Sequence, residues 1–193
     1  MNSTSVSLLD RLKAARPDAS DWNRLQRIYL PLISRWLGRV PGRGVEADDL
    51  AQEVFIVVIR ELPRFERQRE GWFRAWLRRV TVNRVRTHRK RRHKRPAVGL
   101  DPAEQFLESL ADLNGDLARE WDQDHDRQVF AKLLGIVQPD FSPATWEAFR
   151  RFAVDGLPAA RVAEEIKLSV NAVIQAKARI LKRLREEAGE LLA

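Results

Sequence analysis

The residues with the clearest chemistry form a run of cations at positions 84–95. Eight of its twelve residues are lysine or arginine, two are histidine and none is acidic. Such a run can bind phosphates, serve as a localisation signal or remain a solvated surface. Just upstream, apolar residues recur at helical spacing: Trp72, Phe73, Trp76, Leu77 and Val80. We therefore expect one helix over residues 71–95 that buries its first half in a core and presents its second half to a polyanion.

A second set of polar residues lies on a predicted helix pair over residues 158–187. A short helix with small residues, a turn at residues 167–169 and a longer polar helix have helix-turn-helix spacing. The longer helix should turn Val173, Ala176, Ile180 and Leu184 inward. Its outward face then carries side chains that can contact base edges or phosphates, namely Asn171, Ala172, Gln175, Ala178, Arg179 and Lys182. An ordinary helical hairpin has the same spacing, although a bracing helix over 142–154 favours helix-turn-helix.

Patterns for catalysis and metal binding are weak. The chain has no cysteine, which excludes disulfides, thiolate metal sites and thiol nucleophiles. His88, His93 and His125 show no ligand spacing with carboxylates. We therefore expect no enzyme activity, no metal and no cofactor. No apolar run approaches the about 20 residues that span a bilayer, and the N-terminus lacks a secretory signal pattern, so we expect a cytoplasmic protein.

Charge is distributed in blocks along the 193 residues, whose net charge is +8. Residues 1–100 hold 23 basic and 10 acidic residues, residues 101–126 hold one and nine, and residues 127–193 hold 11 and eight. This asymmetry favours a nucleic-acid partner over a generally basic surface. The acidic stretch has few apolar residues, and we interpret it as a linker with little core and room for a short helix over 103–113.

The elements that position these residues are all predicted to be helical, because apolar residues recur every three or four positions and no segment alternates as a strand. Helices are expected near Leu8, over 22–37 with Pro31 inside, over 46–62, over 71–95, over 129–137 and in the three C-terminal segments. Ser20 or Asp21 should cap the second helix. The apolar run 56–59 predicts that more than one side of the third helix is covered. Trp76 is expected in the core, whereas Phe65 could pack there or stack on an exposed base.

Three segments, taken together, resemble a bacterial RNA polymerase sigma factor of the sigma-70 family, extracytoplasmic-function group. They read DDLAQEVF at 48–55, FRAWLRRVTVNR at 73–84 ahead of the cationic run, and AEEI at 163–166 with LSVNAV at 168–173. Their order and spacing are more specific than any one of them. The resemblance implies an all-α fold with a region 2 helical bundle over 1–96, an acidic linker over 97–126, and a region 4 helix-turn-helix domain over 127–193.

The resemblance also implies which residues carry the function. The set expected to dock on core polymerase is Asp48, Asp49, Gln52, Glu53 and Ile56. The set expected to melt and hold the −10 element is Phe65, Arg67, Arg79, Asn83, Arg86, Arg89 and Lys90. The set expected to read the −35 element is Ser169, Asn171, Ala172, Gln175, Arg179 and Lys182. At Ala172 and Lys177 the chain departs from the threonine and leucine common in the family, which leaves the −35 sequence open.

The implied function is to bind core RNA polymerase and direct promoter recognition, −10 melting and transcription initiation. The implied partners are the β′ clamp helices and β flap of the polymerase, promoter DNA and an anti-sigma factor, with no membrane. A stand-alone helix-turn-helix regulator of duplex DNA is the main alternative, but it does not explain two separated binding units. An RNA-binding protein would use the cationic run and leave the C-terminal helix pair without a role.

Overall fold

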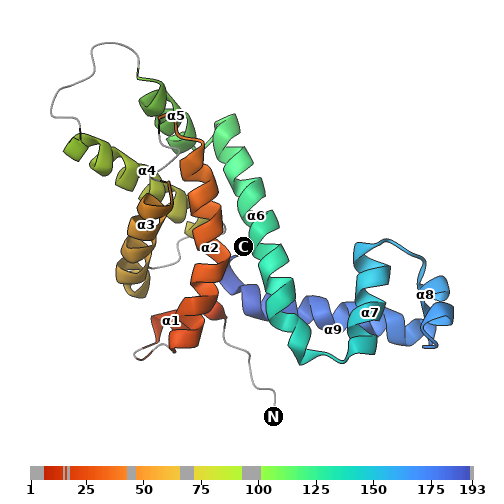
Figure 1. The fold of residues 1–193 in the computed structure, drawn as a ribbon. Helices are drawn as coiled ribbons and strands as arrows, with labels where there is room; N and C mark the ends of the chain where they lie inside the picture. The colour runs from red at the N-terminus through yellow and green to blue at the C-terminus, as the bar shows by residue number, and fades with distance from the viewer. Residues whose placement is uncertain are drawn as a thin grey trace. The chain divides into compact units, whose positions relative to one another are not determined.

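The computed structural model describes residues 7–14, 16, 18–42, 47–65, 72–92 and 101–191. These residues form helices and turns without any strand (Figure 1), which confirms the all-α prediction. They fall into two compact units, which we name after their main segments the N-terminal unit (8–130, with 190–191) and the C-terminal unit (131–189, with residue 7). Among the described helices, none has the length and apolar character needed to cross a membrane.

The N-terminal unit begins with a bundle of four helices: α1 (Leu8–Lys13), α2 (Ala19–Gly38), α3 (Ala47–Glu61) and α4 (Trp72–Arg92). α2 packs against α3, and α3 packs against α4. The buried residues of α2 recur every three or four positions and so lie on one side of that helix: Leu25, Ile28, Tyr29, Leu32, Ile33 and Trp36. The ring of Tyr29 meets that of Phe73 edge-on, with centroids 5.4 Å apart, and so joins α2 to α4.

The start of α2 differs from the prediction. Asp18, rather than Ser20 or Asp21, is the N-cap, and its carboxylate accepts a hydrogen bond from the Ser20 N–H at 2.8 Å. Asp21 is instead buried and pairs with Arg11 at 3.1 Å, which ties α1 to α2. The helix continues through Pro31 as a single element.

Residues 101–126 contribute to the core, so the expectation of a segment with little core is wrong. This stretch forms α5 (Pro102–Ala111) and the first half of α6 (Asp116–Val137). Leu107, Leu110 and Trp121 are buried. The Trp121 and Trp36 ring centroids lie 5.2 Å apart, and the buried His125 contacts the Tyr29 hydroxyl at 3.2 Å. The apolar residues are few, but helical spacing gathers them on one side.

The C-terminal unit contains the predicted helix pair. α7 (Pro143–Phe149) continues into a π-helical turn (Arg150–Val154), followed by α8 (Ala159–Glu165) and α9 (Val170–Ala188). Ser142 caps α7 and Ser169 caps α9, and the Ser169 hydroxyl accepts from the Ala172 N–H at 3.1 Å. The core joins α7 to both later helices through residues that include Ala148, Val162 and Val173. The inward residues predicted for α9 are all buried.

Candidate nucleic-acid interface

The first half of α4 is a core element, as predicted. Phe73, Trp76, Leu77 and Val80 are buried. Phe65 lies in the same cluster, with its ring centroid 5.7 Å from that of Phe73 and 5.0 Å from that of Trp76. Only 8% of Phe65 is exposed, so the structure places it in the core rather than where a base would stack.

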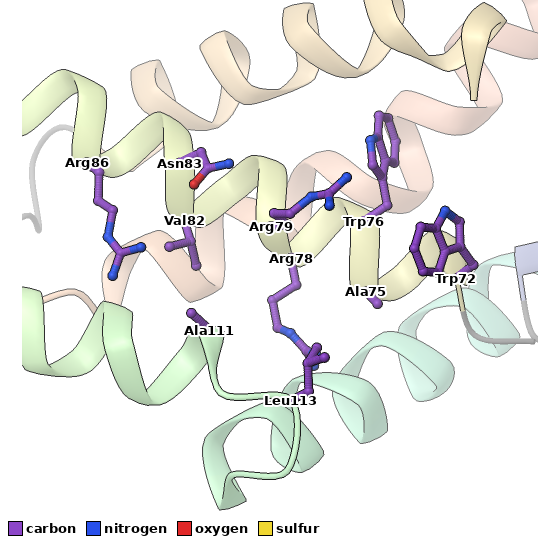
Figure 2. Close-up of a pocket in the computed structure, with 10 residues that line it drawn as sticks. All are labelled: Trp72, Ala75, Trp76, Arg78, Arg79, Val82, Asn83, Arg86, Ala111 and Leu113. Atoms are coloured by element: carbon purple, nitrogen blue, oxygen red, sulfur yellow. The ribbon is translucent and has the colours of Figure 1, made fainter. Parts of the chain in front are cut away.

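The outer side of α4 is an open polar surface that includes part of the predicted −10 set. Arg79, Asn83 and Lys90 are exposed. Arg79 and Lys90 make no ion pair with any other residue that the structure describes. Arg79 and Asn83 line a pocket of about 380 Å³ together with Trp72 and other α4 residues (Figure 2). Arg67, also in the predicted set, lies outside the described residues.

Two other members of the −10 set face acidic side chains of α5. Arg86 Nε lies 2.7 Å from Glu104 Oε1, and Arg89 pairs with Asp101. Burial alone would raise the pKa of Asp101, but hydrogen bonding by the Ala103 N–H and the charge of Arg89 lower it below its usual value. The structure therefore divides the predicted −10 residues into an open group and a group that is already paired.

Most of the predicted polymerase-docking residues share one exposed side of α3. Asp48, Asp49, Gln52 and Ile56 are exposed, and their spacing places them on neighbouring turns. Ile56 is 63% exposed and Ile59 is 38% exposed, so the expectation that the apolar run 56–59 is covered on more than one side of the helix is wrong for the isolated chain. Glu53 is half-buried, and its Oε2 accepts a hydrogen bond from Arg84 Nε of α4 at 2.9 Å, which directs the carboxylate toward α4.

The predicted −35 residues lie along the open side of α9. Asn171, Gln175, Arg179 and Lys182 are exposed, while Ala172 is half-buried and Ser169 serves as the cap. The Lys177 ammonium lies 5.1 Å from the centroid of the Phe152 ring. This cation–π contact explains how α9 accommodates a lysine near its inner side.

Sequence reasoning did not identify every residue that these surfaces contain. Arg74 and Arg78, in the part of α4 where the apolar stripe dominated the prediction, face α6 and pair with Asp126 and Asp122. Ile174 is 46% exposed within the polar face of α9. Its position three residues after Asn171 is the sequence signal that could have placed it there.

Comparison with known proteins finds similarity over part of the N-terminal unit. Residues 25–95 match the family model for Sigma-70 region 2. Over 71 residues the chain is 35% identical to ECF RNA polymerase sigma factor SigE of Mycolicibacterium smegmatis, a match that covers 37% of this chain and 25% of that protein. The matched part thus spans about a quarter of the relative's length.

The matched segment contains α3, α4 and most of α2, which are the helices that carry the open surfaces of the N-terminal unit. Over residues 25–95 the chain therefore resembles Sigma-70 region 2, and its similarity to that relative is to a sigma factor of the ECF group.

Proposed function

We propose that this protein binds core RNA polymerase and directs it to promoters, where it recognises and melts the −10 element to start transcription. The observation that carries this proposal is the presence of two surfaces of different chemistry on adjacent helices of one unit. The open side of α3 combines carboxylates with an exposed isoleucine, while the outer side of α4 is cationic and carries an asparagine. A protein partner suits the first surface, and a nucleic-acid strand suits the second.

On α3, the docking surface consists of Asp49, Gln52 and Ile56, with Asp48 and Glu53 at its edges. A large apolar side chain that is 63% exposed and lies between polar residues is typical of a protein interface. We assign this surface to the clamp helices of the β′ subunit. Supporting contacts to the β flap come from the C-terminal unit, and an anti-sigma factor would compete for the same surfaces.

On α4, Arg79 and Lys90 can contact phosphates, while the amide of Asn83 can pair with a base edge of a melted strand. On α9, Asn171 and Gln175 can read adenine edges in the major groove of a −35 duplex, and Arg179 can contact guanine or phosphate. Residues 1–96 then act as region 2 and residues 127–193 as region 4. Such a protein works in the cytoplasm, where polymerase and promoter DNA meet.

Run-off transcription with purified core polymerase tests the proposal. The wild-type protein should bind core and start transcripts at promoters of its own genome. A protein that does neither refutes the proposal, whereas binding to duplex DNA alone favours the stand-alone regulator.

The docking surface is tested with the double variant Asp49→Lys/Ile56→Ala. Glu53 is less suitable because its loss also frees Arg84. We expect core binding to weaken by about tenfold or more, the size of an interface hot spot, while duplex DNA binding stays within about twofold. Glu108→Lys, the same charge change on an exposed residue of α5, is the matched control and should leave core binding unchanged.

A further inference from the structure

A row of arginines on α4 faces a row of acceptors on α5 and α6, all within the N-terminal unit. Arg74 Nη1 lies 3.0 Å from Asp126 Oδ2, and Arg78 Nη1 lies 2.9 Å from Asp122 Oδ1. Further along α4, Arg86 pairs with Glu104 at 2.7 Å and Arg89 pairs with Asp101. Figure 2 shows Arg78 and Arg86 extending from α4 toward the segment that carries Ala111 and Leu113. The acidic block of the sequence is therefore folded against the cationic block.

The two ends of this row differ in how firmly they are held. Arg78 is 3% exposed and also donates to the Ala118 carbonyl at 3.2 Å, so its contacts are part of the folded core. The Arg86 and Glu104 side chains are 32% and 39% exposed, and those of Arg89 and Asp101 are 17% and 27% exposed. An ion pair that water reaches changes the equilibrium between its paired and separated states by about fivefold or less. Another anion can therefore replace the carboxylate of such a pair.

The exchangeable end of the row holds Arg86 and Arg89, which belong to the set predicted to contact the −10 element. Arg86 lies three residues after Asn83, so the two are neighbours on adjacent turns of α4, and Arg89 lies three residues after Arg86. Because their guanidinium groups are paired with carboxylates, Arg86 and Arg89 attract a phosphate group less strongly than Arg79 and Lys90 do. Leu107 and Leu110 of α5 are buried, so apolar packing holds this helix in the unit. The carboxylates at its start therefore stay close to α4.

We propose that the first turn of α5 acts as an internal competitor of nucleic acid: Asp101 and Glu104 hold Arg86 and Arg89 in the free protein, and phosphates of the melted promoter strand replace them. This inference rests on the proposed function, because it concerns the same α4 surface. It implies that the free protein binds single-stranded DNA more weakly than its cationic run alone would, and that promoter melting releases α5 carboxylates from α4.

The test is the double variant Asp101→Asn/Glu104→Gln in the full chain. Asparagine is as good an N-cap as aspartate, so α5 keeps the cap that Asp101 provides through the Ala103 N–H at 3.0 Å. The matched control is Glu108→Gln/Asp112→Asn. It removes the same charge from α5 and its C-cap residue, at exposed positions that make no ion pair with any described residue. Asp112 Oδ1 accepts from the Asn114 N–H at 3.1 Å, and an asparagine oxygen can accept the same hydrogen bond.

Binding is measured by fluorescence anisotropy with a labelled thymidine oligonucleotide at several salt concentrations. We expect the Asp101→Asn/Glu104→Gln variant to bind roughly 3- to 30-fold more tightly than wild type at low salt. Two extra phosphate contacts should also steepen the log–log salt slope by about 1.4. The control should stay within about twofold of wild type, with an unchanged slope.

Equal gains in the two double variants would overturn the proposal, since they would show a general effect of net charge. No gain in either variant would overturn it as well. If the wild type starts transcription while the two variants bind DNA alike, this inference fails and the proposed function stands. If the wild type neither binds core nor starts transcription, the proposed function fails by itself.

Discussion

Replacing Trp121 by alanine should strongly destabilise the N-terminal unit. Trp121 is fully buried, and its ring centroid lies 5.2 Å from that of Trp36. Its indole N–H has no hydrogen-bond partner among the described residues, so the loss arises from packing. Truncating a buried tryptophan to alanine lowers the free energy of unfolding by about 3–5 kcal/mol. For a unit of this size, that loss corresponds to a fall in Tm of roughly 10–20 °C.

Urea denaturation followed by circular dichroism measures this loss. Leu113→Ala is the control, because Leu113 belongs to the same acidic stretch but is 59% exposed, and its change should stay within about 0.5 kcal/mol. The two units can unfold in separate steps, so the transition that Trp121→Ala shifts must be the one that also responds to Trp36→Ala. A loss below about 1 kcal/mol for Trp121→Ala would refute the reasoning and return residues 101–126 to the role of a loosely attached linker.

Three further predictions concern other parts of the chain. Burial lowers the pKa of His125 despite its contact with Asp126, so the folded protein binds fewer protons than the unfolded chain and the free energy of unfolding should fall as pH drops through about 6.5. Asp126, whose pKa is lowered, stays ionised there, and His125→Gln should flatten the dependence measured by denaturation at several pH values. Lys167 has a φ of 55°, so Lys167→Gly should stabilise the C-terminal unit by about 0.5–1 kcal/mol in a thermal melt; a loss would contradict this account. Asn83→Ala should change promoter choice or melting in footprinting assays, whereas Arg91→Gln should weaken all promoters alike, and equal effects would undo that division.

Local chemistry made some elements predictable from the sequence. Ser142 with Pro143, and Ser169 before the polar helix, define helix starts by cap preferences that act within one turn. The inward and outward sides of α9 follow from helical spacing alone. The start of α2 was predicted wrongly, because Ser20 or Asp21 was expected as the cap where Asp18 serves. Asp21 is instead engaged in an ion pair with Arg11, a contact between segments that no local pattern indicates.

Contacts between distant segments were beyond local reasoning. The burial of Trp121 depends on Trp36, and that of His125 depends on Tyr29, partners that no local pattern indicates. The candidate site shows the same limit. Sequence reasoning placed Arg86 and Arg89 in the cationic run of α4, but only the fold shows that they form ion pairs with Glu104 and Asp101.

The charge blocks of the sequence have a common physical cause in the fold. A helix with many arginines and lysines repels itself, because like charges three or four residues apart destabilise a helix. The carboxylates of α5 and α6 offset that repulsion along α4. The net charges of +13 over residues 1–100 and −8 over residues 101–126 thus lie largely within one folded unit. Charge blocks that suggest separate regions in a sequence can thus mark two sides of one interface. If α4 binds DNA as proposed, the neutralisation that stabilises this helix should also lower its affinity for DNA, so both effects should be measured on the same residues.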